Sequence, residues 1–271
     1  MSDYLRAMGD DSTRDWFPEE AEARNPMKAA QKAMKPVLPR RFYREARVEP
    51  RDGAFVLTLD GRPARTPGRQ ALALATAALG EAVAAEWQAQ GDEVDPATMP
   101  LTRLANSAID GVAPNMAAVT DDLLKYAGSD LTCYRAGEPE RLAAEQGSAW
   151  DPILAWARDA LGARFVLGEG VMFVGQPEPA LAAVQASLVR VTSPFALAAL
   201  HVMTTLTGSV LIALAHAAGR LSAEEAWAAA HVDERFQESV WGEDEEALKR
   251  RALRRADFMA ASRLYALAAR P

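Results

Sequence analysis

Short apolar segments separated by glycine-containing turns occupy the chain from Arg41 to about Leu74. The dipeptides Asp52-Gly53 and Asp60-Gly61 are typical of tight hairpin turns. Between them, Phe55, Leu57 and Leu59 recur at every second position, which predicts a strand with one buried face. This region therefore predicts a small antiparallel sheet.

A helical period replaces the alternation after Thr76, which is placed to cap the helix TAALGEAVAAEWQAQ before Gly91. Further helices are predicted at about 101–109, from Met116 to Gly128, and at 178–191, 194–218, 222–240 and 244–269. One apolar stretch, ARFVLGEGVMFVGQ, is β-branched and built around Gly168-Glu169-Gly170. It predicts a β-hairpin near 164–175.

The order of these elements predicts an α+β fold with three parts. Residues 1–39 hold scattered charges and four prolines, and they are predicted to form a mobile N-terminal arm. Residues 40–112 are predicted to form a β-rich domain with one or two helices. Residues 113–271 are predicted to form a mainly helical domain that contains the hairpin.

The segment FALAALHVMTTLTGSVLIALAHAAG is long enough to raise the question of a membrane span. It carries two histidines and several hydroxyl side chains and lacks an aromatic belt. A helix buried at the centre of a bundle is the better interpretation, so no membrane span is expected.

Composition restricts the possible functions. The chain has 271 residues with 30 Lys and Arg against 37 Asp and Glu, a net charge of −7, which argues against general nucleic-acid binding. Cys133 is the single cysteine, so an intramolecular disulfide and a cysteine-rich metal site are excluded. The N-terminal residues resemble neither a secretory signal nor a transit peptide, which predicts a cytoplasmic protein.

No motif of a catalytic, cofactor-binding or metal site is present. His201, His216 and His231 are spaced too far apart along helices to share a metal ion. GxSxG, GxxxxGK[ST] and GxGxxG motifs do not occur. Cys133 has no local base and is expected to be a small buried thiol.

Two clusters of cations stand out in this acidic chain. Eight cations and one acid lie between Arg24 and Arg47, which is either a solvated leader or a docking element for an acidic partner. Arg62, Arg65 and Arg69 lie beside glycines, where they form either a basic hairpin tip or an anion site.

Several strings together carry a more specific signal. They are RFYREARVEP, LDGRPARTP, VAAEWQAQGDEVDPATMPLTRLANSAIDGV, YAGSDLTCYRA, WDPILAW, TGSVLIALA and DERFQESVWGEDEEA. In this order they resemble the assembly chaperones of the F(1) sector of ATP synthase that bind the alpha subunit, the family of mitochondrial F(1) assembly factor 2 and its bacterial relatives. The resemblance covers about residues 40–265.

The resemblance implies a chaperone and not an enzyme. Such a protein binds unassembled alpha subunit and shields the surface that later meets beta, until beta displaces it. It implies no cofactor and no nucleic-acid partner, a chain that is monomeric when free, and a cytoplasmic location, with eukaryotic relatives in the mitochondrial matrix.

Within the resemblance, the WGED region is the candidate partner-binding site. An aromatic anchor among charged groups suits a specific but reversible contact. The candidate residues are Glu234, Glu238, Trp241, Gly242, Glu243 and Asp244. The alternative is that Trp241 packs the last two helices together. Trp87 and the run from Met99 to Asp110 are expected to be scaffold.

Two other functions remain possible on the sequence. One is a hydrolase with dispersed residues such as Asp121, His201 or Cys133, which requires a polar pocket that collects them. The other is an anion- or nucleotide-binding module that uses Arg62, Arg65 and Arg69.

Overall fold

The computed structural model describes residues 38–170 and 172–268. The described residues from Arg41 onward form one compact unit. The predicted arm, residues 1–39, lies outside the described residues except for its last two positions. The cluster of cations between Arg24 and Arg47 also lies outside the described residues as far as residue 37.

The N-terminal sheet is antiparallel, as predicted. Its strands are β1 (Ala46–Arg51), β2 (Ala54–Leu59), β3 (Arg62–Pro63) and β4 (Ala73–Leu74). The order is β1-β2-β3, and β4 pairs with β2. Both predicted turns adopt left-handed backbone conformations, with φ values of 50° at Asp52 and 79° at Gly53 in the first of them.

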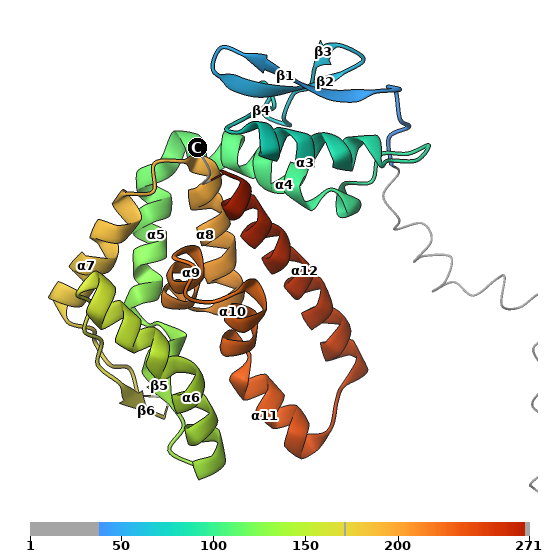
Figure 1. Ribbon diagram of the computed structural model, residues 1–271. Helices are drawn as coiled ribbons and strands as arrows, with labels where there is room; N and C mark the ends of the chain where they lie inside the picture. Colours follow the sequence, from blue (N-terminus) through green and yellow to red (C-terminus); the bar gives the residue numbers. More distant parts are fainter. Residues whose placement is uncertain (1–37, 171, 269–271) are drawn as a thin grey trace, which may run out of the picture. The chain divides into compact units, whose positions relative to one another are not determined.

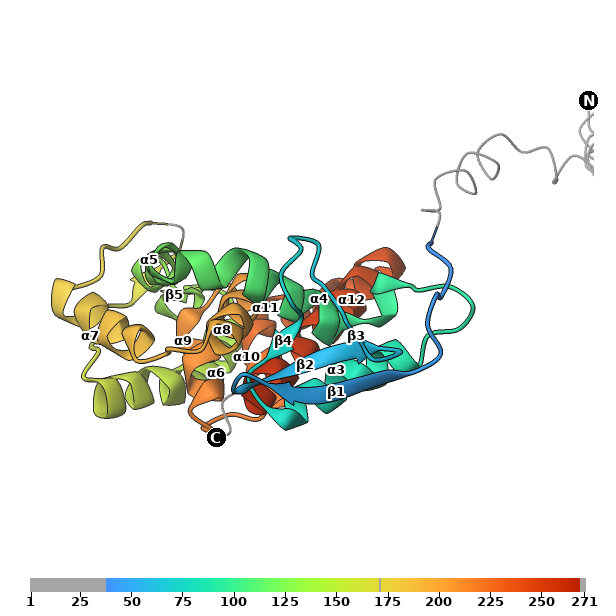
Figure 2. The same cartoon turned by 90° about the horizontal axis from the view of Figure 1, so that it is seen from above.

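One face of this sheet packs on α3 (Ala77–Gln88), and β1 and β2 lie over this helix (Figure 2). Thr76 caps α3, as predicted, because its Oγ1 accepts the Leu79 N–H at 3.1 Å. The packing is close: a Cβ on Gly80 would lie 2.8 Å from Val48 Cγ1. The expectation of a single buried face on β2 is too simple, because Val56 and Thr58 on the opposite face are also buried.

Helices make up most of the rest of the unit (Figure 1). They are α4 (Pro100–Ser107), α5 (Met116–Gly128), α6 (Glu140–Trp156), α7 (Glu178–Val189), α8 (Pro194–Thr207), α9 (Val210–Ala217), α10 (Ala223–Ala230), α11 (Val232–Trp241) and α12 (Glu245–Ala268). Two predicted long helices are each divided in two. The 194–218 segment breaks at Gly208 and Ser209, and the 222–240 segment breaks at His231.

The predicted hairpin near 164–175 is wrong. Its central residues form β6 (Gly168–Glu169), which pairs in parallel with β5 (Tyr134–Arg135), a strand far away in the sequence. The Gln176 side chain closes the loop, because its Nε2 donates to the Val166 carbonyl and its Oε1 accepts the Val166 N–H, both at 2.9 Å. The apolar, β-branched composition indicated extended structure correctly but not its partner.

Two hydrophobic clusters form the core, and both depend on α8 and α12. Phe195 of α8 and Leu264 of α12 belong to the cluster beneath the sheet. Leu200 of α8 and Phe258 of α12 belong to the cluster inside the bundle. The predicted domain boundary after residue 112 therefore stays a prediction, since the same two helices serve both sides of it. Among the described residues, no helix is long and apolar enough to cross a membrane.

A fully buried carboxylate, Asp130, joins the end of α5 to the break between α8 and α9. Its oxygens accept Ser209 Oγ at 2.7 Å, the Leu211 N–H at 3.1 Å, and the Thr132 hydroxyl and N–H at 2.8 and 3.0 Å. Burial raises the pKa of this carboxyl group, while these four hydrogen bonds oppose the rise. The group therefore serves as the side-chain acceptor for donors from two separate segments.

We expect Asp130→Asn to lower the free energy of unfolding by about 2 kcal/mol or more, because an amide NH₂ would face donors inside the core. Urea unfolding followed by circular dichroism measures this. Asp122→Asn, at a half-exposed carboxylate, is the matched control and should cost less than about 1 kcal/mol. Equal losses in the two variants would contradict the role given to Asp130.

Candidate partner-binding surface

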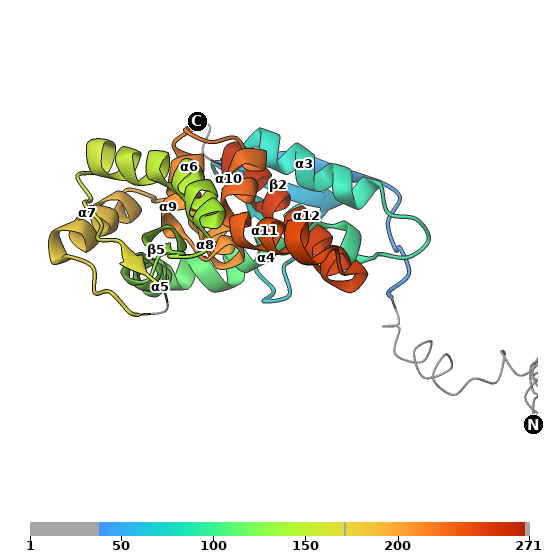
Figure 3. The same cartoon turned by 90° about the horizontal axis from the view of Figure 1, so that it is seen from below.

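Five of the six candidate residues lie at the end of α11 or in the turn to α12, whereas Glu234 lies in the first turn of α11, about 10 Å back along the helix axis from Trp241. Residues 234–246 are here called the α11–α12 tip. Seen from below, α11 lies between α6 and α12 (Figure 3). The chain reverses at Gly242, whose φ of 87° is a left-handed conformation that glycine adopts without strain. The structure thus brings together five of the six residues that sequence reasoning selected, with Glu234 at the other end of α11, and their role as a binding site stays a proposal.

Trp241 projects into solvent at the end of α11, with 86% of its surface exposed. The preceding Val240 is 50% exposed. The alternative in which Trp241 packs the last two helices together is therefore wrong. An indole this exposed buries a large apolar area if a partner covers it.

Glu238 has a different role from its neighbours, because it joins α11 to α12. Both of its carboxylate oxygens accept from the Arg251 guanidinium, with Nη1 to Oε2 at 2.8 Å. The two side chains are only 19% and 21% exposed. A bidentate, half-buried pair of this kind fixes geometry, so Glu238 supports the α11–α12 tip and is less available to a partner than the sequence suggested.

The remaining acids of the α11–α12 tip fall into two groups. Glu245 and Glu246 form ion pairs with Lys249 and Arg250 one helical turn further on, which neutralises them locally. Glu234 and Glu243 are exposed and form no ion pair with another described residue. Together with the exposed Asp244, they supply the negative charge of the α11–α12 tip that no ion pair with a described residue compensates.

Asp244 is exposed and caps α12, since its Oδ1 accepts the Ala247 N–H at 2.7 Å. Its carboxylate therefore also stabilises the first turn of the helix. Substitution of Asp244 would shorten α12 as well as change the charge, which makes it a poor probe of binding.

The base of α11 is fixed by α6. Gln146 Nε2 donates to Asp233 Oδ1 at 2.7 Å, while Gln146 Oε1 accepts the Ala136 N–H at 2.8 Å. Arg141 lies 5.4 Å from the centre of the Phe236 ring. Sequence reasoning missed Gln146, and no local pattern marks it, because its partners lie 10 and 87 residues away.

His231 forms the junction between α10 and α11. Its Nδ1 lies 2.8 Å from the Trp227 carbonyl oxygen, and its ring lies 3.8 Å from the Trp227 ring. Burial lowers the pKa of this imidazole, because the charged form is desolvated there. The neutral ring is thus the form that the folded junction favours.

The residues of the dispersed-hydrolase alternative do not line one pocket: Asp121 lines a pocket between α5 and α7 that neither His201 nor Cys133 lines. His201 Nε2 lies 2.9 Å from Asp122 Oδ2, a partly exposed pair whose hydrogen bond lowers the pKa of Asp122. Cys133 is buried elsewhere, and desolvation raises its pKa to about 12, so it stays a thiol. Within the described ranges, no group of His, Cys, Asp and Glu could hold a metal ion.

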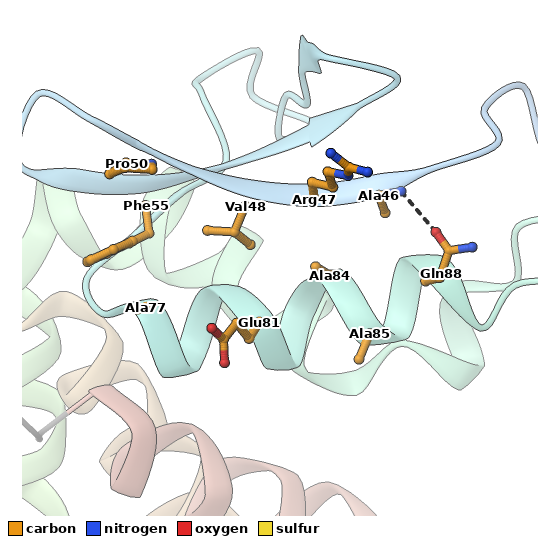
Figure 4. Close-up of a pocket in the computed structure, with 10 residues that line it drawn as sticks. All are labelled: Ala46, Arg47, Val48, Pro50, Phe55, Ala77, Glu81, Ala84, Ala85 and Gln88. Atoms are coloured by element: carbon orange, nitrogen blue, oxygen red, sulfur yellow. Dashed lines mark hydrogen bonds between the residues drawn. The ribbon is translucent and has the colours of Figure 1, made fainter.

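A groove of about 470 Å³ lies between β1 and α3 (Figure 4). Ala46, Val48 and Pro50 form one wall, and alanines of α3 form the other. β1 is an edge strand, but its outer edge is protected: Gln88 Oε1 accepts the Ala46 N–H at 2.9 Å, and Pro50 has no N–H. This groove therefore offers little for strand addition.

A second cavity, of about 510 Å³, brings together Phe42, Tyr43, Trp87, Arg62 and Arg65 from three segments. We call it the aromatic–arginine cavity. Arg69 does not line it, although its carbonyl accepts Arg65 Nη1 at 2.8 Å. The structure thus joins two of the three arginines that sequence reasoning grouped.

The scaffold role expected for Trp87 and for the run from Met99 to Asp110 agrees with their surroundings. The Trp87 carbonyl accepts the Tyr43 hydroxyl at 2.6 Å, which ties α3 to the strand region. Met99 and Leu101 are buried in the core beneath the sheet. Asp110 holds the loop after β3, because it accepts the Thr66 hydroxyl at 2.6 Å and the Gly68 N–H at 2.8 Å.

Comparison with known proteins defines the class. Residues 40–158 match the family model of the ATP12 chaperone protein. The crystal structure of Atp12 from Paracoccus denitrificans is similar, with a TM-score of 0.81 and 43% identity over 85% of this chain and 98% of that chain. A single-substitution mutant of the same Atp12p gives 0.81 and 42% over the same shares.

A protein from Agrobacterium tumefaciens described as a candidate chaperone gives a TM-score of 0.83 and 47% identity over 94% of this chain and 97% of that chain. The α+β fold with its small sheet and helical bundle is thus the fold of a group of chaperones. The chain belongs to the ATP12 chaperone family.

We expect acidification to loosen the junction at His231. A depressed pKa of a folded-state imidazole contributes stability that is complete above about pH 6.5 and is lost as the pH falls through the folded-state pKa. The free energy of unfolding obtained from urea titrations should therefore fall more between pH 7.5 and pH 5 for the wild type than for His231→Asn. Equal pH dependence in both proteins would show that His231 does not titrate with unfolding.

Proposed function

We propose that this chain binds the unassembled alpha subunit of the F(1) sector of ATP synthase and shields its beta-facing surface in the bacterial cytoplasm. Membership of the ATP12 chaperone family carries this proposal. The alpha subunit, and its release by beta, come from the resemblance of the sequence strings to assembly chaperones of that sector.

The physical need is an exposed obligate interface. Subunit interfaces of permanent complexes are large and apolar, and they associate non-specifically when they are uncovered. A chaperone without a catalytic cycle releases its client when a tighter competitor binds an overlapping surface. Cys133 is buried and its pKa is raised to about 12, and the partly exposed His201–Asp122 pair lies apart from it, which supports a role in binding rather than catalysis.

The α11–α12 tip is the proposed contact surface. Trp241 is the observation that carries this assignment, because a tryptophan that is 86% exposed at the end of a helix has no structural role in the free protein. Glu243 follows this anchor in the turn, Glu234 lies about two helical turns before it on α11, and their uncompensated charges would favour a complementary basic surface on the partner.

The first test is a pull-down from host lysate with the tagged full chain at low salt, followed by mass spectrometry and by addition of purified beta. Recovery of alpha, and its release by beta, is the expected result. Recovery of a folded tagged protein without alpha would contradict the proposed function.

The surface is tested by the double variant Trp241→Ala/Glu243→Lys. We expect its affinity for purified alpha to fall at least about tenfold, because the anchor and the free charge are both lost. The melting temperature should stay nearly unchanged, because both side chains are exposed. Calorimetric titration and thermal unfolding measure the two quantities.

Two further variants sharpen this test. Glu93→Lys, an exposed charge reversal remote in sequence from the α11–α12 tip, should keep wild-type affinity. Glu238→Lys should lower the melting temperature, because it would place a second cation against Arg251. If the tip variant binds alpha as the wild type does, the surface assignment fails while the proposed function stands.

A further inference from the structure

We propose that the aromatic–arginine cavity binds an acidic, extended segment of the client polypeptide, as a second contact separate from the α11–α12 tip. This inference rests on the proposed function, since the client supplies the segment. The cavity has the size of a ligand pocket, about 510 Å³. Phe42, Tyr43, Trp87, Arg62 and Arg65 carry the argument.

An aromatic row forms one side of the cavity. The Phe42 and Tyr43 rings meet edge to face at 5.4 Å, and the Tyr43 and Trp87 rings are 5.6 Å apart. Tyr43 is buried and bonded to α3, so the row is rigid, whereas Phe42 is 73% exposed. An exposed phenylalanine beside a cavity is a surface on which an apolar side chain of a partner can pack.

Arg41 holds the aromatic row in place, and its guanidinium is not available to a ligand. Its guanidinium lies 4.6 Å from the centre of the Tyr43 ring and donates to the carbonyl oxygens of Tyr43 and Arg44 at 3.0 and 2.9 Å. Its remaining hydrogen bonds go to carbonyl oxygens at the end of α3. The aromatic side is thus already organised in the free protein.

Exposed cations also line the cavity. Arg62 and Arg65 are exposed, and among the described residues neither forms an ion pair. Asp60 is the one acid that lines the cavity. Its carboxylate accepts the backbone N–H groups of Arg44 and Glu45 at 3.1 and 2.9 Å, which lowers its pKa and directs it toward the backbone.

These features together favour one occupant. The two exposed guanidinium groups favour a carboxylate ligand, which they can bind in a bidentate manner. The aromatic row in the same cavity favours an apolar residue next to the acid. An extended segment that alternates acidic and apolar residues offers both kinds of side chain to the cavity.

The cavity is far from the first proposed contact. It lies at the sheet, and the α11–α12 tip lies at the other end of the unit that begins at Arg41 (Figure 1). The 24 residues of α12 alone span about 36 Å from this turn toward the sheet. Loss of one contact therefore leaves the other intact, which makes them separable by mutation.

The cavity is tested first with a dye-labelled decapeptide of alternating Leu and Glu, with a decapeptide of alternating Leu and Lys as the control probe. Fluorescence anisotropy with the full chain should show binding of the acidic peptide only. Arg62→Glu/Arg65→Glu should weaken it at least about tenfold. Arg69→Glu, an equally exposed arginine outside the cavity, should change it less than about twofold.

Arg65 also bonds the Arg69 carbonyl, so Arg62→Glu alone and Phe42→Ala serve as second variants that leave this hydrogen bond in place. Each variant should bind the acidic peptide more weakly than the wild type does, and its melting temperature should be unchanged. Equal binding of both peptides, or equal affinity in the wild type and Arg62→Glu, would overturn the proposal. Displacement of the peptide by low concentrations of pyrophosphate would instead identify a simple anion site and would also overturn it.

The same variants with purified alpha separate this inference from the proposed function. If the wild type binds alpha and Arg62→Glu/Arg65→Glu binds at least about tenfold more weakly, the client supplies the acidic segment. Equal affinity would overturn the inference and leave the proposed function standing. If the wild type does not bind alpha, the proposed function fails, and with it the client as the source of the segment.

Discussion

The constraint on which the rest of the structure depends is the buried carboxylate of Asp130. It accepts four hydrogen bonds from two segments, and through Ser209 and Leu211 it fixes the point where α8 ends and α9 begins. The Leu131 N–H adds a bond to the Gly208 carbonyl at 3.2 Å in the same place. Because α8 contributes to both hydrophobic clusters, the position of this break determines how the sheet cluster and the bundle cluster are aligned.

The second organising element is α12, which belongs to both clusters at its C-terminal half and leaves them at its N-terminal half. Leu264 and Phe258 are fully buried, whereas Leu253, on the same side of the helix as Leu264, is 70% exposed. The end of the helix beyond the core is supported by Arg251 through Glu238 and by Arg254, which donates to the Leu206 carbonyl at 2.9 Å. Because α12 is packed in the core at one end and held by these two arginines at the other, it presents its exposed N-terminal half in a defined orientation.

Sequence reasoning predicted what local chemistry determines. The turns at Asp52 and Asp60, the Thr76 cap and the α+β order follow from propensity and period. It failed where distant residues decide. Gly208 and Ser209 lie within a long, mainly apolar segment, and the Asp130 carboxylate, 79 residues away from Ser209, accepts the hydroxyl of the serine that caps α9. The segment around Gly168 has a parallel partner at Tyr134 instead of a hairpin partner.

In the candidate site, Trp241 and the acids could be identified from the sequence by residue type. The pairing of Glu238 with Arg251 could not, because it requires the fold. The same holds for the cavity that Phe42, Arg62 and Trp87 line together.

The two contacts proposed above would have a consequence for release, because they are separate. When a client is held at both the α11–α12 tip and the aromatic–arginine cavity, the second contact forms at the high effective concentration that the first one creates. Each contact can then be weak alone, and the complex is still stable. A competitor that displaces the client from one contact removes this advantage, so the remaining contact dissociates quickly without any input of chemical energy. A passive chaperone needs this combination, because it must hold an apolar interface firmly and still give it up to the proper subunit.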